Sequence, residues 1–292
     1  MLIMSKVDTQ YRDLMRQVLE HGVTLPSQQG VDAKMIFGNP PLKYDLSQGF
    51  PVITERDLSK FWRAPIGELF GFINGARTQK QLEEFGCKWW KAWVTPEKCR
   101  KRGLSPGDLG PGSYGAAFHD FPTSEGESFN QIKYLIKQIK EQPQLRTHFV
   151  SPWIPQYIYR VDGRQQKVVV CPCHGWMHFR VINGKLSLHM FQRAGDLPIG
   201  VPSNLIQYSA FLLAVTHVTG LKVGEYVHTI SDAHIYLDQK DAVKQMLKRE
   251  PRPLPMIKLV NPPDDIFAFR SDNFELVDYH PHPAIKGIPA AV

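Results

Sequence analysis

Two stretches of alternating apolar residues, at positions 176–182 and 185–191, are separated only by Asn183-Gly184. Alternation with a period of two is typical of β-strands that bury one face. An Asn-Gly pair between two such strands favours a two-residue hairpin turn, because both positions must adopt a positive φ. The sequence therefore predicts an antiparallel hairpin near the middle of the chain, and every other element has to pack around it.

Helical patterns flank this hairpin on both sides. Apolar residues recur with helical spacing at 7–19, 58–73, 128–141, 203–219 and 238–249, and further strand-like runs occur near 35–37, 168–170 and 226–230. This mixture predicts an α+β fold, with a large and mostly antiparallel mixed sheet packed with helices. Residues 1–292 are predicted to form a single domain, in which the polar, tryptophan-rich segment 76–127 is a small subdomain or lid.

Composition narrows the class of protein. With 42% hydrophobic and 22% charged residues, bulk disorder is excluded. The sequence contains neither the run of about 20 apolar residues that a membrane helix needs nor a signal-peptide core, so we expect no membrane association. Four cysteines are too few to crosslink a chain of 292 residues, which predicts a reducing, cytoplasmic location.

The net charge of +7 is compatible with a nucleic-acid partner or with a small polyanionic substrate. A nucleic-acid-binding module should interleave aromatic and basic residues on one face. Here the tryptophans cluster near 62 and 89–93, most basic residues are scattered, and the dense basic run 98–102 precedes turn-forming residues, as in a solvated loop. These patterns favour the small substrate, and a nucleic-acid-binding module is kept as the alternative.

The motif Cys171-Pro172-Cys173-His174 directly precedes the predicted hairpin. A cysteine thiol is a strong nucleophile once a nearby cation raises the fraction of thiolate. Arg193 is the candidate cation for Cys173, because the hairpin can return the chain to that point. A buried structural cysteine is the alternative. The Cys-x-Cys-His pattern also permits a metal site, but a second pair of ligands is missing, and no metal is predicted.

Other residues suggest recognition of a base and a sugar. The amide of Asn204 offers one donor and one acceptor, which match the adjacent N–H and carbonyl of a uracil edge; the alternative is that Asn204 caps a following helix. His234 and Tyr236 alternate on an extended segment and point the same way, which suits either sugar hydroxyls or a packed core pair. Glu68 lies in an apolar helix, so a buried or cleft position is expected.

The order of these motifs resembles the thymidylate synthase family, which also includes pyrimidine-nucleotide hydroxymethylases. The similarity extends nearly from end to end. It is carried by Gly49-Phe50-Pro51, Gly67-Glu68-Leu69, Trp90-Lys91-Ala92-Trp93, Asp108-Leu109-Gly110-Pro111, Tyr114-Gly115, Pro172-Cys173-His174, Gln192-Arg193, Asp196, Asn204, His234 with Tyr236, and the tail from Pro281-His282-Pro283-Ala284-Ile285-Lys286 to Ala290-Ala291-Val292.

The resemblance implies a covalent mechanism. Cys173 would add to C6 of a pyrimidine nucleotide, and C5 would then attack the methylene of 5,10-methylenetetrahydrofolate. Asn204 would stabilise the charge that develops at O4. Glu68, with His174 nearby, would move protons through ordered water, and Tyr114 would belong to the network that removes the C5 proton.

The resemblance also implies two sets of binding residues and an oligomeric state. The nucleotide would contact Gln192, Arg193, Asp196, Asn204, His234 and Tyr236. The folate would contact Glu68, Trp90, Trp93, Asp196, Gly200, Tyr236 and Ala291. The enzyme would be a homodimer, in which Arg146 reaches the phosphate site of the neighbouring subunit.

Four positions depart from the family pattern. Gln28 and Thr147 stand where the family has arginine, Ala194 replaces a serine, and Ser203 replaces an aromatic residue. The usual phosphate site therefore lacks two guanidinium groups and a hydroxyl, and each charged hydrogen bond contributes roughly 1.5–3 kcal/mol. Lys34 and the basic run 98–102 are the candidates to replace them.

These features predict reductive methylation of dUMP to dTMP. The alternative is hydroxymethylation of dUMP, dCMP or CMP, in which water captures the methylene intermediate. Trp90 and the C-terminal tail favour a dry site and hence methylation, whereas the small, polar Ser203 favours entry of water. A catalytically inactive, regulatory homologue is a further alternative, because the phosphate site is incomplete.

Overall fold

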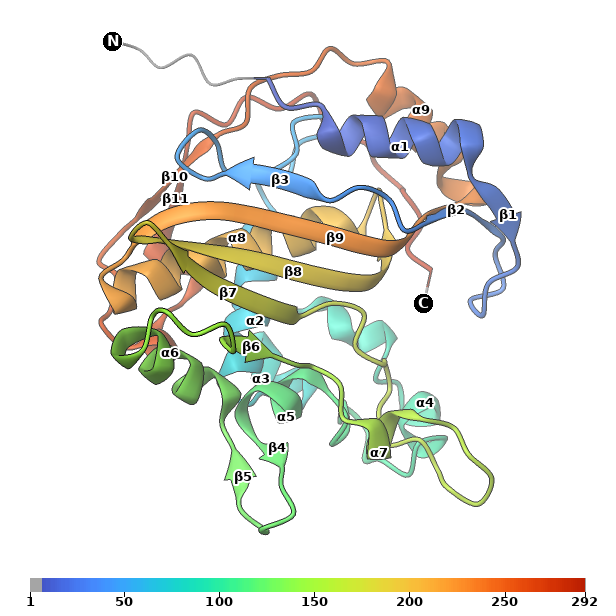
Figure 1. Ribbon diagram of the computed structural model, residues 1–292. Coiled ribbons are helices and arrows are strands. Elements are labelled where there is room, and N and C mark those ends of the chain that lie inside the picture. The colour runs from blue at the N-terminus through green and yellow to red at the C-terminus, as the bar shows by residue number, and fades with distance from the viewer. Residues whose placement is uncertain (1–6, 292) are drawn as a thin grey trace.

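The computed structural model describes residues 7–291, and a seven-stranded sheet forms its centre (Figure 1). The strand order is β1-β2-β9-β8-β7-β6, and β3 also pairs with β9. All neighbouring strands are antiparallel except β8 and β9, which are parallel. The strands are β1 (Val23–Leu25), β2 (Ala33–Phe37), β3 (Leu42–Asp45), β6 (Phe149–Val150), β7 (Trp176–Ile182), β8 (Lys185–Asp196) and β9 (Lys222–Tyr236). The predicted α+β class with a mostly antiparallel mixed sheet is confirmed.

The predicted hairpin joins β7 to β8. Asn183 and Gly184 have φ angles of 51° and 74°, as a two-residue turn of this kind requires. Strand β8 continues to Asp196, beyond the predicted end at residue 191. Because side chains alternate along a strand, Gln192 is buried on one face while Arg193 is exposed on the other.

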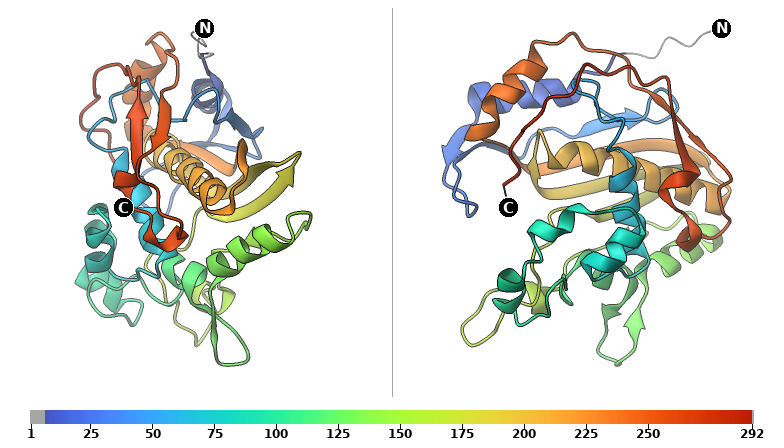
Figure 2. Two further views of the ribbon diagram at one scale, coloured as in Figure 1. Left: turned by 90° about the vertical axis from the view of Figure 1, so that its left-hand side faces the viewer. Right: turned by 180° about the vertical axis from the view of Figure 1, so that it is seen from behind.

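Helices α8 (Gly200–Thr219) and α2 (Arg63–Ile73) lie on one face of the sheet, as Figure 2 shows. Helix α8 is buried on nearly all sides because it lies between the sheet and α2, and it ends at Gly220, whose φ is 69°. The helix begins three residues before its predicted start at 203. Asn204 therefore lies inside the helix, and the alternative that it is an N-cap is wrong, since Ile199 occupies that position.

Three further predicted helices are present: α1 (Gln10–His21), α6 (Gln131–Glu141) and α9 (Lys240–Leu247). Helix α6 begins later than predicted because the Asn130 side chain accepts a hydrogen bond from the Lys133 amide at 2.9 Å and caps it. Helix α2 begins at Arg63 rather than 58, since hydrogen-bonded turns at the Leu58 carbonyl precede it.

The prediction of a strand at 168–170 is wrong. These residues are irregular, although Val168 is buried, and the Val169 amide donates to the carbonyl of Leu109, which is not in a strand. Their β-branched side chains reflect burial under a loop rather than membership of the sheet. Two other strands are longer than predicted. Residues 35–37 belong to β2, which pairs with β1, and residues 226–230 are the middle of β9.

Shorter elements surround this centre. Segment 76–127 contains α3 (Gln79–Glu84), η1 (Trp89–Ala92), α4 (Pro96–Arg100), α5 (Tyr114–His119) and β4 (Phe121–Pro122), while β5 (Ser128–Phe129), α7 (Pro155–Ile158), η2 (Leu237–Gln239), β10 (Met256–Leu259), η3 (Ile266–Ala268), η4 (Ser271–Asn273) and β11 (Phe274–Val277) complete the fold. The basic run 98–102 was expected to be a loop, but it includes the end of α4.

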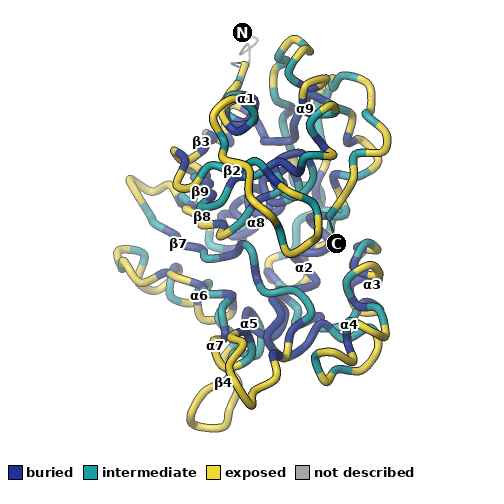
Figure 3. Tube along the Cα trace, turned by 90° about the vertical axis from the view of Figure 1, so that its right-hand side faces the viewer, coloured by how far each residue is buried: buried dark blue, intermediate teal, exposed yellow. Residues whose placement is uncertain are grey.

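The C-terminal segment returns across the molecule to the end of the sheet where β9 stops, on the side of the exposed β1–β2 loop (Figures 2 and 3). Val292, the last residue of the predicted tail, lies outside the described residues. Within residues 7–291, no helix combines the length and the apolar character needed to cross a bilayer.

Candidate active site

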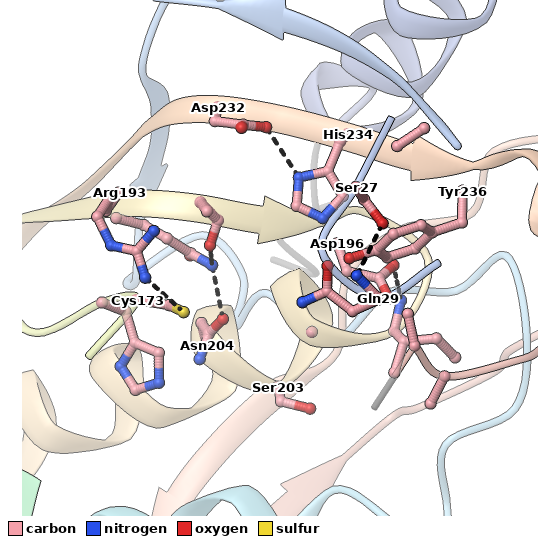
Figure 4. Close-up of a pocket in the computed structure, with 18 of the residues that line it drawn as sticks. Ser27, Gln29, Cys173, Arg193, Asp196, Ser203, Asn204, Asp232, His234 and Tyr236 are labelled. Carbon is pink, nitrogen blue, oxygen red and sulfur yellow. Dashed lines mark hydrogen bonds and ion pairs between the residues drawn. The ribbon is translucent and has the colours of Figure 1, made fainter. Parts of the chain in front are cut away.

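A cavity of about 600 Å³ opens beside the start of α8 and the ends of β8 and β9 (Figure 4). All but one of the predicted site residues line it: Glu68, Trp90, Trp93, Tyr114, Cys173, His174, Gln192, Arg193, Asp196, Gly200, Asn204, His234, Tyr236 and Ala291. The β1–β2 loop and the C-terminal tail contribute to its wall. Residues from the whole length of the chain therefore meet at one cavity.

Cys173 lies at the wall of the cavity and is partly exposed. The β7–β8 hairpin returns the chain to it: the amide of Arg193 donates to the Cys173 carbonyl at 2.6 Å, and the Arg193 Nη2 atom lies 3.2 Å from the sulfur. The Tyr114 hydroxyl accepts a hydrogen bond from the Cys173 amide at 2.6 Å. The nucleophile is therefore accessible and held from both sides, beside the predicted cation.

Burial raises the pKa of the Cys173 thiol, and the guanidinium of Arg193 only partly offsets this effect. The Arg193 guanidinium acts in the direction expected of a nearby cation, but desolvation outweighs the charge. In the free protein the sulfur therefore holds its proton at neutral pH, and it must be deprotonated when a substrate binds.

His174 follows the nucleophile and is buried at the cavity wall. Its Nδ1 atom lies 2.5 Å from the Tyr208 hydroxyl, and its ring stacks on Tyr114 at 4.6 Å between centroids. Burial and the nearby Arg193 lower the pKa of His174 to about 3. The ring is therefore neutral at physiological pH, and any part it takes in proton transfer uses a neutral imidazole.

Glu68 is buried and receives several hydrogen bonds. The indole nitrogens of Trp89 and Trp90 donate to its Oε1 atom at 2.8 and 2.6 Å, and the Gln207 amide donates to its Oε2 atom at 2.5 Å. Burial raises the pKa of Glu68, while these donors act in the opposite direction. Trp89 was not predicted, although its position beside Trp90 was a signal for it.

Both ends of the Asn204 amide have partners in the protein. Its Oδ1 atom accepts from the Gln192 amide at 3.0 Å, and its Nδ2 atom donates to Gln207 Oε1 at 2.9 Å. Gln207 was not predicted as a functional residue. Its spacing of three from Asn204 on an apolar helix was the available signal, since such residues are neighbours on the helix surface.

Asp196 joins the cavity to the C-terminal tail. The Gln239 amide donates both to Asp196 Oδ2 at 3.0 Å and to the carbonyl of Pro289 at 2.8 Å. Burial raises the pKa of Asp196 to about 6. Gln239 was not predicted, because no local sequence pattern marks it.

Aromatic rings form another part of the wall. Trp90 and Trp93 lie 6.0 Å apart between centroids, and Phe61 stacks on Trp89 at 5.4 Å. A flat, apolar wall in a cavity that also presents the carboxyl groups of Glu68 and Asp196 suits a heteroaromatic ring that carries hydrogen-bond donors. These residues therefore fit the pterin of a folate.

His234 and Tyr236 lie together at the end of strand β9, as predicted, with ring centroids 5.1 Å apart. The Asp232 carboxylate, 2.8 Å from His234 Nδ1, fixes the orientation of the imidazole. Burial raises the pKa of Tyr236 to about 12, so its hydroxyl remains protonated and can donate. Asp232 was not predicted, although it shares a strand face with His234.

Among the described residues that line the cavity, Arg193 is the only Lys or Arg, whereas Glu68, Asp196 and Asp232 carry carboxyl groups. Neither predicted replacement for the missing arginines lines the cavity. Lys34 donates to the Leu19 carbonyl at 2.8 Å, and the basic run 98–102 lies elsewhere. These two expectations are wrong.

Arg146 is the one predicted site residue outside the cavity. It is exposed, and its carbonyl oxygen lies 3.0 Å from His178 Nε2 on β7. His178 faces the same side of the sheet as the exposed Phe149 and His189, with which it is paired. The buried residues that alternate with them on β7 and β8 face α8, so Arg146 lies at the opposite, open face of the sheet.

Within residues 7–291, no group of three or more His, Cys, Asp or Glu side chains is arranged to hold a metal ion.

The family model for thymidylate synthase matches residues 9–291, which is nearly the whole chain. The chain therefore belongs to the thymidylate synthase family, whose members transfer a one-carbon unit from a folate to C5 of a pyrimidine nucleotide.

Proposed function

We propose that this protein converts dUMP to dTMP by reductive methylation. The observation that supports this most strongly is that the Cys173 thiol, the Arg193 guanidinium and the Asn204 amide line one cavity. A nucleophile, an anion receptor and a reader of the base are thereby available to the same small molecule.

In this proposal the sulfur of Cys173 attacks C6 of the uracil ring. The proton of the thiol must leave as the bond forms, and Arg193, 3.2 Å from the sulfur, stabilises the thiolate at that moment. Electron density moves to O4, where the donor of Asn204 stabilises it. Glu68, whose burial raises its pKa, is suited to exchange protons in the cavity.

A folate would occupy the aromatic part of the cavity. Trp90, Trp93 and Asp196 would hold its pterin, with Gly200 and Ala291 completing the wall. When bound, 5,10-methylenetetrahydrofolate supplies the one-carbon unit and, for methylation, a hydride. The link from Asp196 through Gln239 to Pro289 would keep the tail over this site and exclude water.

The phosphate would lie beside Arg193, and Arg146 of a second copy would complete its binding site. The open face of the sheet supports such a homodimer, because Phe149 and Phe191 on it are 54% and 38% exposed. Apolar side chains of this size on a sheet face favour burial against a partner. Arg146 stands on that face, where it can reach a neighbouring subunit.

The remaining predictions about organisation are retained as proposals. Residues 1–292 would act as one domain, with segment 76–127 as a lid that carries Trp90 and Trp93. Cytoplasmic location is supported by the four cysteines, which are all free.

Hydroxymethylation of dUMP, dCMP or CMP is the second candidate. Ser27, Gln28, Gln29 and Ser203 contribute polar side chains to the cavity wall. Polar, small side chains there favour water near the reacting carbon, and water would then compete with hydride for the methylene intermediate.

Product analysis separates the candidates. The protein is incubated with methylenetetrahydrofolate and with dUMP, UMP, dCMP or CMP, and the nucleotide and folate products are identified by mass spectrometry. We expect dTMP and dihydrofolate from dUMP. A hydroxymethyl nucleotide with tetrahydrofolate identifies the second candidate, and no product from any nucleotide favours an inactive, regulatory homologue. Cys173→Ala is the control, since it should abolish every product.

A further inference from the structure

A continuous chain of buried hydrogen bonds runs from β9 through β8 and α8 to Glu68 on α2. Each link is between 2.5 and 3.0 Å long, and Figure 4 shows the one that meets Asn204 from Gln192. The chain comprises Tyr226, His228, Gln192, Asn204, Gln207 and Glu68, in that order. It passes through the residue proposed to read the base and ends on the proposed proton-handling acid.

The ionised carboxylate fixes the direction of this chain. A carboxylate only accepts hydrogen bonds, so Gln207 must donate to Glu68 through Nε2 and has only Oε1 left to accept. Asn204 must then donate to Gln207 through Nδ2 and accept from Gln192 through Oδ1. The assignments at each amide agree with this order.

The far end of the chain agrees as well. Burial lowers the pKa of His228 to about 3, so its ring is neutral and carries one N–H. Burial also raises the pKa of Tyr226 well above its usual value, so its hydroxyl stays protonated. Gln192 donates to Asn204 through Nε2 and has only Oε1 left to accept, so His228 Nε2 donates to it at 2.8 Å. His228 Nδ1 then accepts from the Tyr226 hydroxyl at 2.9 Å. Every bond points toward Glu68.

The orientation of one amide decides which base fits. Turning a carboxamide by 180° exchanges its oxygen and nitrogen. Uracil presents an N–H beside a carbonyl oxygen, whereas cytosine presents an acceptor nitrogen beside an amino group. Each orientation of Asn204 therefore complements one base and leaves unpaired polar groups against the other, which is a strong source of discrimination.

We propose that Gln207 is a specificity-determining positioning residue, which transmits the ionised state of Glu68 to Asn204 and holds its amide in the orientation that reads uracil. The inference rests on the proposed function, because uracil is the ring named there. Gln207 is fully buried and does not line the cavity, so it acts through Asn204 rather than on the substrate.

Glu68 is the group in this chain of hydrogen bonds whose protonation state can change. The other titratable groups that interact with it are Cys87, whose sulfur lies 3.8 Å from Oε1, and Tyr208. Burial raises the pKa of both, so each keeps its proton. When Glu68 itself is protonated, Oε2 can donate, the amides can reverse, and Asn204 is no longer held in one orientation.

The test measures equilibrium binding of dUMP and dCMP without folate, by calorimetry, to the full chain. Gln207→Met keeps the length of the side chain but removes its amide. We expect it to reduce the preference for dUMP over dCMP by about tenfold or more, as the loss of one orienting hydrogen bond at a buried site implies. Ser209→Ala is the matched control, because Ser209 lies on the same helix and its buried hydroxyl has no hydrogen-bond partner within residues 7–291. Its preference should equal that of the wild type.

The same titrations at lower pH add a readout that a packing role would not change. The wild-type preference for dUMP should decrease as the pH falls through the raised pKa of Glu68, and that of Gln207→Met should not depend on pH. If Gln207→Met does not fold, Glu68→Gln serves instead, since a neutral amide at that position can donate or accept and should also relax the preference.

The outcomes separate the inference from the proposed function. An unchanged preference in Gln207→Met overturns the role of Gln207, whether or not dTMP is made. A wild-type preference for dCMP that disappears in Gln207→Met supports the positioning role and overturns the choice of dUMP. A wild-type protein that binds neither nucleotide and forms no product overturns both proposals.

Discussion

Arg193 Nη2 lies 3.2 Å from the sulfur of Cys173, although twenty residues separate them in the chain. The contact exists because the β7–β8 hairpin pairs Trp176 with Phe191 and carries Arg193 back beside the nucleophile. The guanidinium lowers the pKa of the thiol, and burial raises it by more. The reactivity of Cys173 therefore depends on a balance that single substitutions can shift.

Replacing Arg193 with glutamine should raise the pKa of Cys173 further. Since the thiolate is the reactive form, alkylation by iodoacetamide at pH 7.5 should slow by about tenfold for each unit of pKa. Mass spectrometry of the peptide that contains Cys173 measures this rate without any substrate. Arg193→Lys is the control and should retain most of the rate; equal rates for wild type and Arg193→Gln would contradict the prediction.

Asp196 should make stability depend on pH. Its pKa is about 6 in the folded protein, against an ordinary value of 3.8, so between these values the folded state keeps a proton that the unfolded state has released. The free energy of unfolding should therefore decrease as the pH rises from 3.8 to about 6, by at most about 3 kcal/mol from this group. Urea titrations of the wild type and Asp196→Asn across this range measure the difference, and parallel pH profiles would show that the carboxyl group contributes nothing.

Restoring positive charge should tighten binding of a nucleoside monophosphate. Gln28 lines the cavity and Thr147 follows Arg146 on the exposed segment. With both changed to arginine, we expect dUMP to bind about tenfold tighter or more, since two charged hydrogen bonds become possible.

Deoxyuridine, which lacks the phosphate, should bind this double variant as it binds the wild type. Gln165→Arg adds a charge at an exposed position outside the cavity, and it controls for a general change in potential. Equal tightening by Gln165→Arg would assign the effect to net charge instead of the phosphate site.

A charge on the open face of the sheet should disrupt the proposed homodimer. Phe149 is 54% exposed on that face, and Phe149→Asp would place an unpaired carboxylate at the interface. Sedimentation velocity should show dimers for the wild type and monomers for the variant at micromolar concentration, with loss of activity because Arg146 no longer reaches its partner. Phe37, 77% exposed at the end of β2, provides the control through Phe37→Asp, which should remain dimeric.

Trp89 should influence the pH at which the acid limb of the kcat/KM profile falls. Its indole donates to Glu68 Oε1 at 2.8 Å, and this bond lowers the pKa of Glu68 against the effect of burial. Trp89→Phe keeps an aromatic ring but removes the donor, so the acid limb of the kcat/KM profile should move to higher pH. Phe61→Leu, which removes only the stacking partner of Trp89, should leave that limb in place; a shift of equal size in both variants would point to altered packing.

The sequence predicted much of the site because its motifs sit within single elements. Asn183-Gly184 specified the turn, and the order of Cys173, Arg193, Asn204 and His234 specified the family. Local signals were less reliable where packing competed with them: residues 168–170 have the composition of a strand but lie in an irregular segment, since their backbone partners belong to loops.

The roles of Gln207, Trp89, Asp232 and Gln239 became clear only in the folded protein. Gln207, Trp89 and Gln239 act through partners on other elements, whereas Asp232 contacts His234, two residues along the same strand. A sequence pattern fixes which face of a helix or strand is buried, because that follows from the local geometry of the backbone. Which side chains then meet depends on how the elements pack: the hydrogen bond from Gln207 to Glu68 spans 139 positions of the chain, and only the contact of α8 with α2 brings the two together.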